Sequence, residues 1–472
     1  MKVFSFCTLH SALCTPRWRL WLAAILLLGA PAVLGAEPAD WIGVNGASAE
    51  RVPEPVFGGN VMLYRAGRRD GEAVVLIHGL GQNGAQDWSK LIPALAERYD
   101  VYALDLPGFG QSDKGNHLYS PDNFARVIEA VVARHVSRPF VLIGHSMGGA
   151  VSLGYAAAYP SRVNRMILVD MAGVLHRSVY SEFLSRLGAQ LATGVYPEDA
   201  PWFSSLVRTV LTRVESIPFS SQIVLQIPAM RQRLLKGDPN AIAAYALVEH
   251  DFSRALRGVR APTLVIWGSE DRVAPLRTGE LAAATIPGAR LAVIRGAGHI
   301  PQLQVPQQFN PIVLDELQGR SKLAPYALPR REIQGDRVAS CDGQSGQRYN
   351  GDYRELSLSK CANAQIANAR VGVLKVTDSD VRILNSHIRD GVEARNSRLE
   401  LTGVALGGGP ALVLDASSVD AAGTRFESGG GIAANRGTVP VTVAVSVSEA
   451  LRGGAPRYVH EVVRLAPGNL WQ

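Results

Sequence analysis

Strong charge is the first thing that this sequence lacks. Only 19% of the residues are charged, the net charge at pH 7 is a mild +7, and no basic stripe runs along the chain. Proteins that bind nucleic acid usually present a clearly basic face, so we expect no nucleic-acid partner. The hydrophobic content of 47% is typical of a globular protein, and 472 residues leave room for two to three domains.

Acidic residues are also absent from the beginning of the chain, where none precedes Glu37. A basic segment at 2–19 leads into an apolar run at 20–34, and small residues follow as far as Ala36. This layout is typical of a secretory signal peptide. We therefore predict that residues 1–36 are a signal and that the protein is exported, either to the periplasm or out of the cell. An uncleaved membrane anchor is the alternative.

Cysteine is scarce, with four in the whole chain, and two of these fall in the predicted signal. The mature chain keeps only Cys341 and Cys361, and an even pair in an oxidising compartment indicates a local disulfide. Two unpaired buried thiols are the other reading. The cleavage point has no cysteine, which argues against a lipid-anchored form, and no later segment approaches transmembrane length.

Short apolar strands alternate with helical patterns from about residue 37 to residue 322. This alternation predicts an α/β fold whose parallel sheet is covered on both faces. A helix is expected at Trp88–Arg98, another at Pro121–His135 and a third at Gly149–Ala158. The expected strands follow a first strand pair around Glu54–Arg68 and are Ala73–Ile77, Val101–Leu104, Phe140–Ile143, Met166–Val169, Thr263–Trp267 and Arg290–Ile294.

The alternation is interrupted at about residues 172–256, where several strongly apolar segments have helical spacing. An insertion of this size over the strand ends would form a helical cap. These segments either pack onto the body of the domain or line an apolar substrate cleft as a lid, and both readings stay open.

The composition changes after residue 322. A linker at 323–336 leads into 337–472, which is rich in turn residues and β-branched residues. Apolar pairs recur here about every twenty residues, and this period predicts a small parallel β-solenoid. An antiparallel β-sandwich is the alternative. The pairs are Leu356/Leu358, Val381/Ile383, Leu399/Leu401, Val419/Ala421 and Val439/Val441.

A serine occupies a position typical of nucleophiles. Residues 144–148 have the pattern G-x-S-x-G around Ser146, with the apolar run Phe140–Ile143 before it and a small-residue helical stretch after it. A strand, a tight turn and a helix in this order expose the serine oxygen in a strained conformation. Ser146 is therefore the predicted nucleophile, and His145 beside it is expected to pack or to support the site.

A serine nucleophile needs a base, an orienting acid and donors for the oxyanion. His299, in a glycine-rich loop after the last predicted strand, is the candidate base, and Asp271, just past a strand end, is the candidate acid. Two backbone N–H groups should form the oxyanion hole, those of Met147 and Leu80. Asp170 is the second choice for the acid and Glu270 the third.

Residues 58–318 resemble the α/β-hydrolase superfamily, and the closest variants are capped esterases, lipases, carbon–carbon bond hydrolases and serine perhydrolases. The resemblance implies the triad Ser146, Asp271 and His299, in the chain order that this fold uses. Serine at the nucleophile position argues against dehalogenase-like and epoxide-hydrolase-like members, which carry aspartate there. The matching segments are His78-Gly79, Asp105–Ser112, Gly144–Gly149, Gly268–Asp271 and Gly298-His299.

These observations together predict an exported serine hydrolase that cleaves carboxylic esters, with lipidic esters favoured by the apolar cap. We expect it to need no cofactor and no metal. An acyltransferase or a carbon–carbon bond hydrolase on the same triad is one alternative, and an envelope-binding protein with a degenerate hydrolase body is another. The β-rich domain is expected to attach to an envelope polymer, another partner or a second copy.

Overall fold

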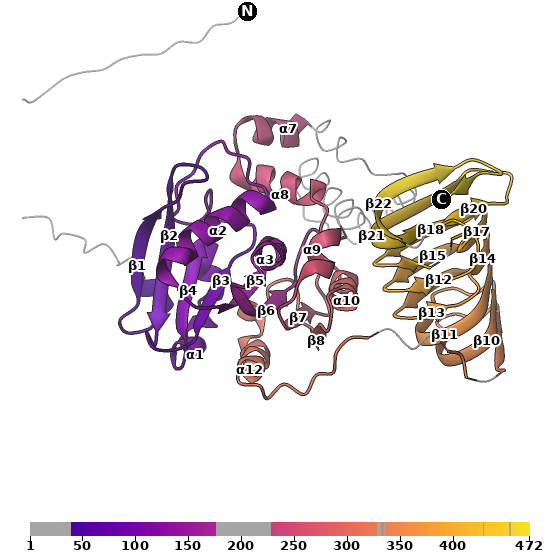
Figure 1. Ribbon diagram of the computed structural model, residues 1–472, viewed down its shortest axis with the longest axis horizontal. Helices are drawn as coiled ribbons and strands as arrows, with labels where there is room; N and C mark the ends of the chain where they lie inside the picture. Colours follow the sequence, from indigo (N-terminus) through magenta and orange to yellow (C-terminus); the bar gives the residue numbers. More distant parts are fainter. Residues whose placement is uncertain (1–38, 176–227, 328–331, 335, 428, 453–454) are drawn as a thin grey trace, which may run out of the picture.

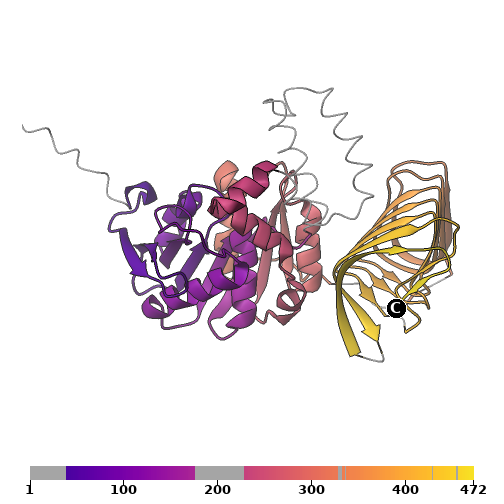
Figure 2. The ribbon, with the colours of Figure 1, turned by 90° about the horizontal axis from the view of Figure 1, so that it is seen from above.

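The computed structural model describes residues 39–175, 228–327, 332–334, 336–427, 429–452 and 455–472. The predicted signal, residues 1–36, lies outside the described residues, and so does most of the predicted cap, residues 176–227. The described chain forms an α/β domain and, beside it, a stack of β coils (Figures 1 and 2). In this part of the chain no helix combines the length and the apolar character needed to cross a membrane.

An eight-stranded sheet forms the centre of the α/β domain, in the order β1-β2-β4-β3-β5-β6-β7-β8. The pairs β1–β2 and β2–β4 are antiparallel, whereas the other neighbours are parallel. The predicted strands are all present, with slightly different ends. The strands are β1 (Ser48–Pro53), β2 (Asn60–Gly67), β3 (Ala73–Ile77), β4 (Asp100–Asp105), β5 (Phe140–His145), β6 (Val163–Val169), β7 (Thr263–Gly268) and β8 (Arg290–Ile294).

Helices cover both faces of this sheet (Figures 1 and 2). Neighbouring residues of a strand point to opposite faces, so Val75 joins one buried cluster and Val74 the other. The first cluster includes side chains from α2 (Pro121–His135), α3 (Met147–Ala158), α8 (Pro239–Glu249), α9 (Ser253–Gly258) and α10 (Leu276–Thr285). The second includes side chains from the 3-10 helix η2 (Gly84–Trp88), α1 (Ile92–Ala96) and α12 (Pro306–Leu317). The remaining helices are η1 (Asp40–Ile42), α7 (Pro228–Leu235) and α11 (Pro301–Gln304).

Two predictions about the first half of the domain were wrong in their bounds. The first strand pair lies at 48–67, because Glu54–Gly59 forms the turn and not a strand. The Glu54 carboxylate accepts hydrogen bonds from the backbone N–H groups of Val56, Phe57 and Gly59, which closes this turn. The helix expected at Trp88–Arg98 is divided into η2, which ends at Trp88, and the short helix α1.

The C-terminal domain is a parallel β-solenoid, as predicted, and not an antiparallel sandwich. Its coils stack as three parallel ladders, in which β12-β15-β18-β21, β13-β16-β19-β21 and β11-β14-β17-β20 are successive neighbours. Two antiparallel strands close the C-terminal end, β22 on β21 and β23 on β20. The strands are β9 (Val338–Asp342), β10 (Arg348–Ser359), β11 (Ala364–Thr377), β12 (Asp380–Leu384), β13 (His387–Ile388), β14 (Val392–Arg395), β15 (Arg398–Thr402), β16 (Ala405–Leu406), β17 (Leu412–Asp415), β18 (Ser418–Ala422), β19 (Arg425–Phe426), β20 (Ala433–Asn435), β21 (Val441–Arg452), β22 (Ala455–Leu465) and β23 (Leu470–Trp471).

A ladder of serine hydroxyls stabilises one corner of the coils. The backbone N–H groups of Cys361, Ser379 and Ser397 donate to the hydroxyl oxygens of Ser379, Ser397 and Ser417 of the next coil, at 2.9–3.1 Å. Each serine follows a residue with positive φ, such as Asp378 or Asn396, residue types that tolerate the left-handed conformation. The turn residues that give the region its composition therefore form the corners.

The register corrects two of the predicted apolar pairs. Leu356/Leu358 pairs with Leu374/Val376, on a different face from Val381/Ile383, which pairs with Ala364/Ile366. At the other end, Val443/Val445 continues the ladder after Val419/Ala421, whereas Val439 is 47% exposed. The simple period failed at both places because β10 and β11 near one end of the stack and β21 near the other are longer than one side of a coil.

The predicted disulfide is present between Cys341 and Cys361. Both residues are buried in the solenoid core, with Leu358 and Ala364 in the same cluster. The bond joins β9 to the turn between β10 and β11, in the first coils of the stack, where the apolar interior has fewer neighbouring coils to cover it.

Helices α9 and α10 join the two domains. Arg277, in the first turn of α10, is only 11% exposed, and its guanidinium donates to Asp420 Oδ2 (2.7 Å), Thr402 Oγ1 (2.8 Å) and the Leu401 carbonyl (3.0 Å) of the solenoid. Ala422 and Val447 of the solenoid belong to the same buried cluster as the core of the α/β domain. The two domains therefore meet through an apolar contact as well as through Arg277.

We expect Arg277→Ala to lower the free energy of unfolding by about 3 kcal/mol, because it leaves the partly buried Asp420 without its cation. Denaturant unfolding followed by circular dichroism measures the change. Arg395→Ala is the matched control, since Arg395 is 75% exposed on the solenoid and its loss should cost almost nothing. Equal stability of the two variants would show that the Arg277 contacts do not hold the domains together.

Candidate active site

Ser146 lies at a sharp turn between β5 and α3. Its backbone has φ 52° and ψ −120°, a conformation that non-glycine residues rarely adopt. Glycine is required on both sides, because a Cβ at Gly144 would overlap the carbonyl oxygen of Gly148, and a Cβ at Gly148 would overlap the carbonyl oxygens of Ile77 and His78. The turn therefore holds the Ser146 side chain at the carboxyl end of the sheet.

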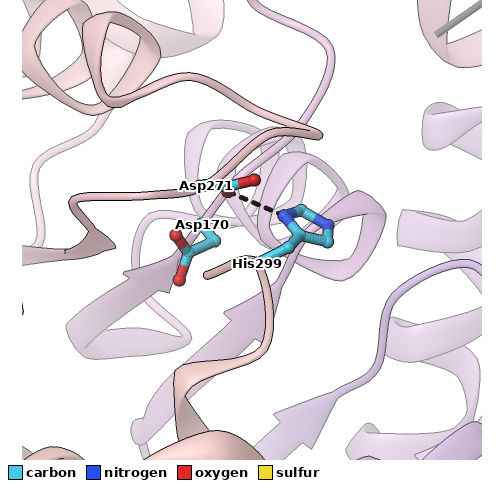
Figure 3. Close-up of side chains that lie close together, drawn as sticks. All are labelled: Asp170, Asp271 and His299. Atoms are coloured by element: carbon cyan, nitrogen blue, oxygen red, sulfur yellow. Dashed lines mark hydrogen bonds and ion pairs between the residues drawn. The ribbon is translucent and has the colours of Figure 1, made fainter. Parts of the chain in front are cut away.

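The structure brings Ser146, His299 and Asp271 together in one hydrogen-bonded chain. The distance from Ser146 Oγ to His299 Nε2 is 2.9 Å, and from His299 Nδ1 to Asp271 Oδ2 it is 2.7 Å (Figure 3 shows the second contact). A carboxylate only accepts, so Nδ1 carries the proton and donates it to Asp271. Nε2 is then free to accept the Ser146 hydroxyl proton, which is the arrangement that general-base catalysis needs.

Backbone donors orient the acid. Asp271 Oδ1 accepts from the N–H groups of Val273 (2.7 Å) and Ala274 (2.9 Å), and the Asp271 side chain is fully buried. The second-choice acid, Asp170, lies close by but hydrogen-bonds elsewhere, to the N–H of Gly268. The geometry therefore favours Asp271 as the partner of His299.

His145, at the end of β5, supports the base, in keeping with the supporting position expected for it. Its Nε2 lies 2.7 Å from the carbonyl oxygen of His299 and must donate, because a carbonyl only accepts. Burial, reinforced by repulsion from His299, lowers the pKa of His145 to about 3. His145 is therefore neutral at ordinary pH and fixes the main chain that carries the base.

The two predicted oxyanion donors come from different segments. Met147 begins α3, where the backbone N–H has no acceptor within the helix. Leu80 lies in the loop after β3, and the preceding Gly79 lies so close to the site that a Cβ there would be 3.0 Å from Ser146 Cβ. Met147 follows Ser146 in the chain and the loop of Leu80 adjoins it through Gly79, and the role of both residues as donors stays a prediction.

Two side chains hold the Leu80 loop in place. His78 Nε2 accepts from the N–H of Leu106 at 2.9 Å, so Nδ1 carries the proton and donates to the carbonyl of Gly79 at 2.6 Å. Asn240, at the start of α8, accepts from the N–H of Gly81 at 2.9 Å. Asn240 was not predicted, because nothing in the local sequence pattern places this residue, far along the chain, beside the loop.

Asp170, Asp271 and His299 are the one group among the described residues that could hold a metal, with one ligand atom from each within 4.8 Å of the others. Two of the three are already joined by the hydrogen bond from His299 to Asp271. The hydrogen bonds of the predicted triad account for the proximity of these residues.

Comparison with known proteins gives the class. The family profile of the alpha/beta hydrolase fold matches residues 72–306. A 2-hydroxy-6-oxononadienedioate/2-hydroxy-6-oxononatrienedioate hydrolase of Cupriavidus pinatubonensis (strain JMP 134 / LMG 1197) is 30% identical over 255 residues, which cover 52% of this chain and 86% of that protein. The protein therefore belongs to the α/β hydrolase family, and it is a hydrolase of this fold.

Further relatives include an uncharacterized hydrolase, YugF, of Bacillus subtilis (strain 168), which is 27% identical over 52% of this chain and 89% of its own length. Among solved structures, a bacterial membrane phospholipase A has 24% identity and a TM-score of 0.45 and covers 60% of this chain and 89% of its own. The family match ends at residue 306, so the solenoid lies outside it.

The low pKa of His145 predicts how stability depends on pH. The unfolded chain takes up this proton near pH 6.5 and the folded chain only near pH 3, so the stabilising contribution is lost as the pH falls between these values. His145→Gln removes this titrating group. The slope of the free energy of unfolding against pH, on the acid side, should therefore become smaller by up to about 1.4 kcal/mol per pH unit.

Urea unfolding at several pH values between 7 and 4 measures this slope. Ser152→Ala, a buried substitution on α3 that removes no titratable group, is the control and should keep the wild-type slope. An unchanged slope in His145→Gln would contradict the assignment of a neutral, buried His145.

Proposed function

We propose that the protein is an exported serine hydrolase that cleaves carboxylic esters, with a preference for apolar acyl groups. The observation that carries the proposal is the hydrogen-bonded chain from Asp271 through His299 to the strained Ser146. Each of these residues follows the carboxyl end of a parallel strand, which is where sheets of this kind bind their substrates.

In the proposed mechanism Ser146 Oγ attacks the ester carbonyl while His299 Nε2 takes the hydroxyl proton. The N–H groups of Met147 and Leu80 stabilise the oxyanion, and each such donor contributes about 3 kcal/mol in the transition state. His299 then gives its proton to the leaving alcohol. Water, activated by the same histidine, hydrolyses the acyl-enzyme, and Asp271 keeps His299 in the correct tautomer throughout.

Ester cleavage is favoured because it needs only these groups: a nucleophile, a base that becomes an acid, and oxyanion donors. The second candidate is a carbon–carbon bond hydrolase, which the similarity to the Cupriavidus 2-hydroxy-6-oxononadienedioate hydrolase favours. This reaction uses the same triad but must in addition protonate a carbon leaving group, which an ester hydrolase does not need to do.

The apolar acyl preference and the export rest on different observations. The preference rests on the apolar pattern of the cap sequence, most of which lies outside the described residues. Export is supported by the Cys341–Cys361 disulfide, a bond that persists in oxidising compartments. Attachment of the solenoid to an envelope polymer, another partner or a second copy stays a prediction.

Ser146→Ala should abolish hydrolysis of p-nitrophenyl octanoate, with a loss of kcat of about a thousandfold or more, because no other group can form the acyl-enzyme. The release of p-nitrophenol measures the rate. Ser152→Ala is the matched control, since Ser152 is also buried on α3 but its hydroxyl has no hydrogen-bond partner among the described residues, so its loss should leave kcat near that of the wild type.

Turnover that persists in Ser146→Ala would refute the serine mechanism. If the wild type does not hydrolyse the ester but cleaves a 2-hydroxy-6-oxo-dienoate, the protein is a carbon–carbon bond hydrolase. An acyl ester formed from an added alcohol, in place of the free acid, would identify an acyltransferase.

A further inference from the structure

A second buried carboxyl group lies directly behind the triad. Asp170 follows β6 and is fully buried, and it adjoins Asp271 and His299 (Figure 3). One carboxylate oxygen of Asp170, one of Asp271 and a ring nitrogen of His299 all lie within 4.8 Å of one another. The mechanism proposed above uses only one of these two acids.

The two carboxyl groups have very different numbers of hydrogen-bond donors. Asp271 accepts from the N–H groups of Val273 and Ala274 and from His299 Nδ1. Asp170 accepts only from the N–H of Gly268, at 2.9 Å on Oδ1, while Oδ2 is buried without a partner among the described residues. Since hydrogen bonds to the charged form stabilise it, the negative charge belongs on Asp271.

An unpaired, buried carboxylate oxygen beside a second carboxylate is costly, because two negative charges at this distance repel each other in a medium of low dielectric constant. A proton on Asp170 Oδ2 removes the repulsion and turns the unpaired acceptor into a donor. Within the part of the chain that the structure describes, the carboxylate next to it is that of Asp271.

We propose that Asp170 is a positioning residue that stays protonated and donates a hydrogen bond to the Asp271 carboxylate, so that the two acids share one negative charge. The proposal rests on the proposed serine-hydrolase function and adds a fourth donor to the acid of the triad. Burial, opposed by the hydrogen bond from Gly268 and reinforced by the charge of Asp271, holds the pKa of Asp170 well above its usual value, in agreement with this assignment.

The arrangement has a consequence for the base. A general base must be neutral to accept a proton, and every further negative charge beside a base favours its protonated form. With Asp170 neutral, His299 faces a single charge, on the oxygen that it contacts. The other titratable groups around this cluster are His145 at the end of β5, His78 in the loop after β3 and Asp87 of η2.

Substitutions of Asp170 test the proposal through the acid limb of the kcat/KM profile on p-nitrophenyl octanoate. Asparagine is the neutral isostere of the protonated acid, so Asp170→Asn should keep at least a third of kcat and move the acid limb by less than about 0.3 pH unit. Asp170→Ala loses the donor and should lower kcat about tenfold or more while KM stays within twofold. If Asp170 is ionised, Asp170→Asn removes a charge and should move the acid limb down by about one pH unit or more, which would overturn the proposal.

The pH dependence of the melting temperature tests the proposal without an activity assay. A protonated Asp170 binds its proton more tightly in the folded than in the unfolded chain, so the wild type loses stability as the pH rises above about 4. Asparagine cannot lose a proton, and the melting temperature of Asp170→Asn relative to the wild type should therefore rise between pH 5 and 8. A constant difference over this range would contradict the proposal, and so would failure of this isosteric variant to fold.

Two further variants separate this proposal from the proposed function. Asp271→Asn removes the negative charge that orients His299. It should lower kcat about ten-thousandfold relative to the wild type, a far larger loss than that of Asp170→Asn. If Ser146→Ala abolishes ester hydrolysis while Asp170→Asn shifts the acid limb, only the role of Asp170 is wrong. If Ser146→Ala stays active, the proposed function fails, and the melting temperatures still decide whether Asp170 holds a proton.

Discussion

The left-handed conformation of Ser146 is the constraint on which the site depends. A backbone with φ 52° at a serine costs about 1–3 kcal/mol and persists only because the surroundings impose it. They do so here because Gly144 lets β5 lie against the first turn of α3, and Gly148 lets α3 approach the end of β3, so closely that no side chain fits at either contact. The same turn starts α3 at Met147, and it places Ser146 Oγ within hydrogen-bond distance of His299 Nε2.

The acid of the triad connects this site to the second domain. The loop that carries Asp271 leads directly into α10, and Arg277 in the first turn of that helix is bonded to the solenoid through Thr402 and Asp420. The indole N–H of Trp267 donates to the carbonyl of Ala274 and so holds the same loop in place. The solenoid therefore holds the helix that follows the acid, and it is part of the folded body that supports the site.

The sequence predicted the elements whose signal is local. Apolar runs gave the parallel strands, and the pattern around Ser146 gave the turn, because the residues that form each of them are neighbours in the chain. The order of motifs also predicted that Asp271 and His299 would adjoin Ser146. Local patterns could not show that Asn240 holds the Leu80 loop or that Asp170 lies behind Asp271, since both contacts join distant segments. The predicted apolar pairs at the two ends of the solenoid were wrong for a related reason. The strand that continues a ladder is set by its pairing with the neighbouring coil, and a sequence period does not show this pairing.

The proposed mechanism depends most on the activation of the Ser146 nucleophile by His299. Reaction of the protein with a fluorophosphonate, followed by peptide mass spectrometry, tests it directly, since such reagents phosphonylate activated serines. One adduct per chain on the peptide that contains Ser146, formed about a hundredfold or more slowly in His299→Ala, is the result expected of a base-activated nucleophile. An adduct on another residue, or a rate at Ser146 that does not depend on His299, would contradict the account.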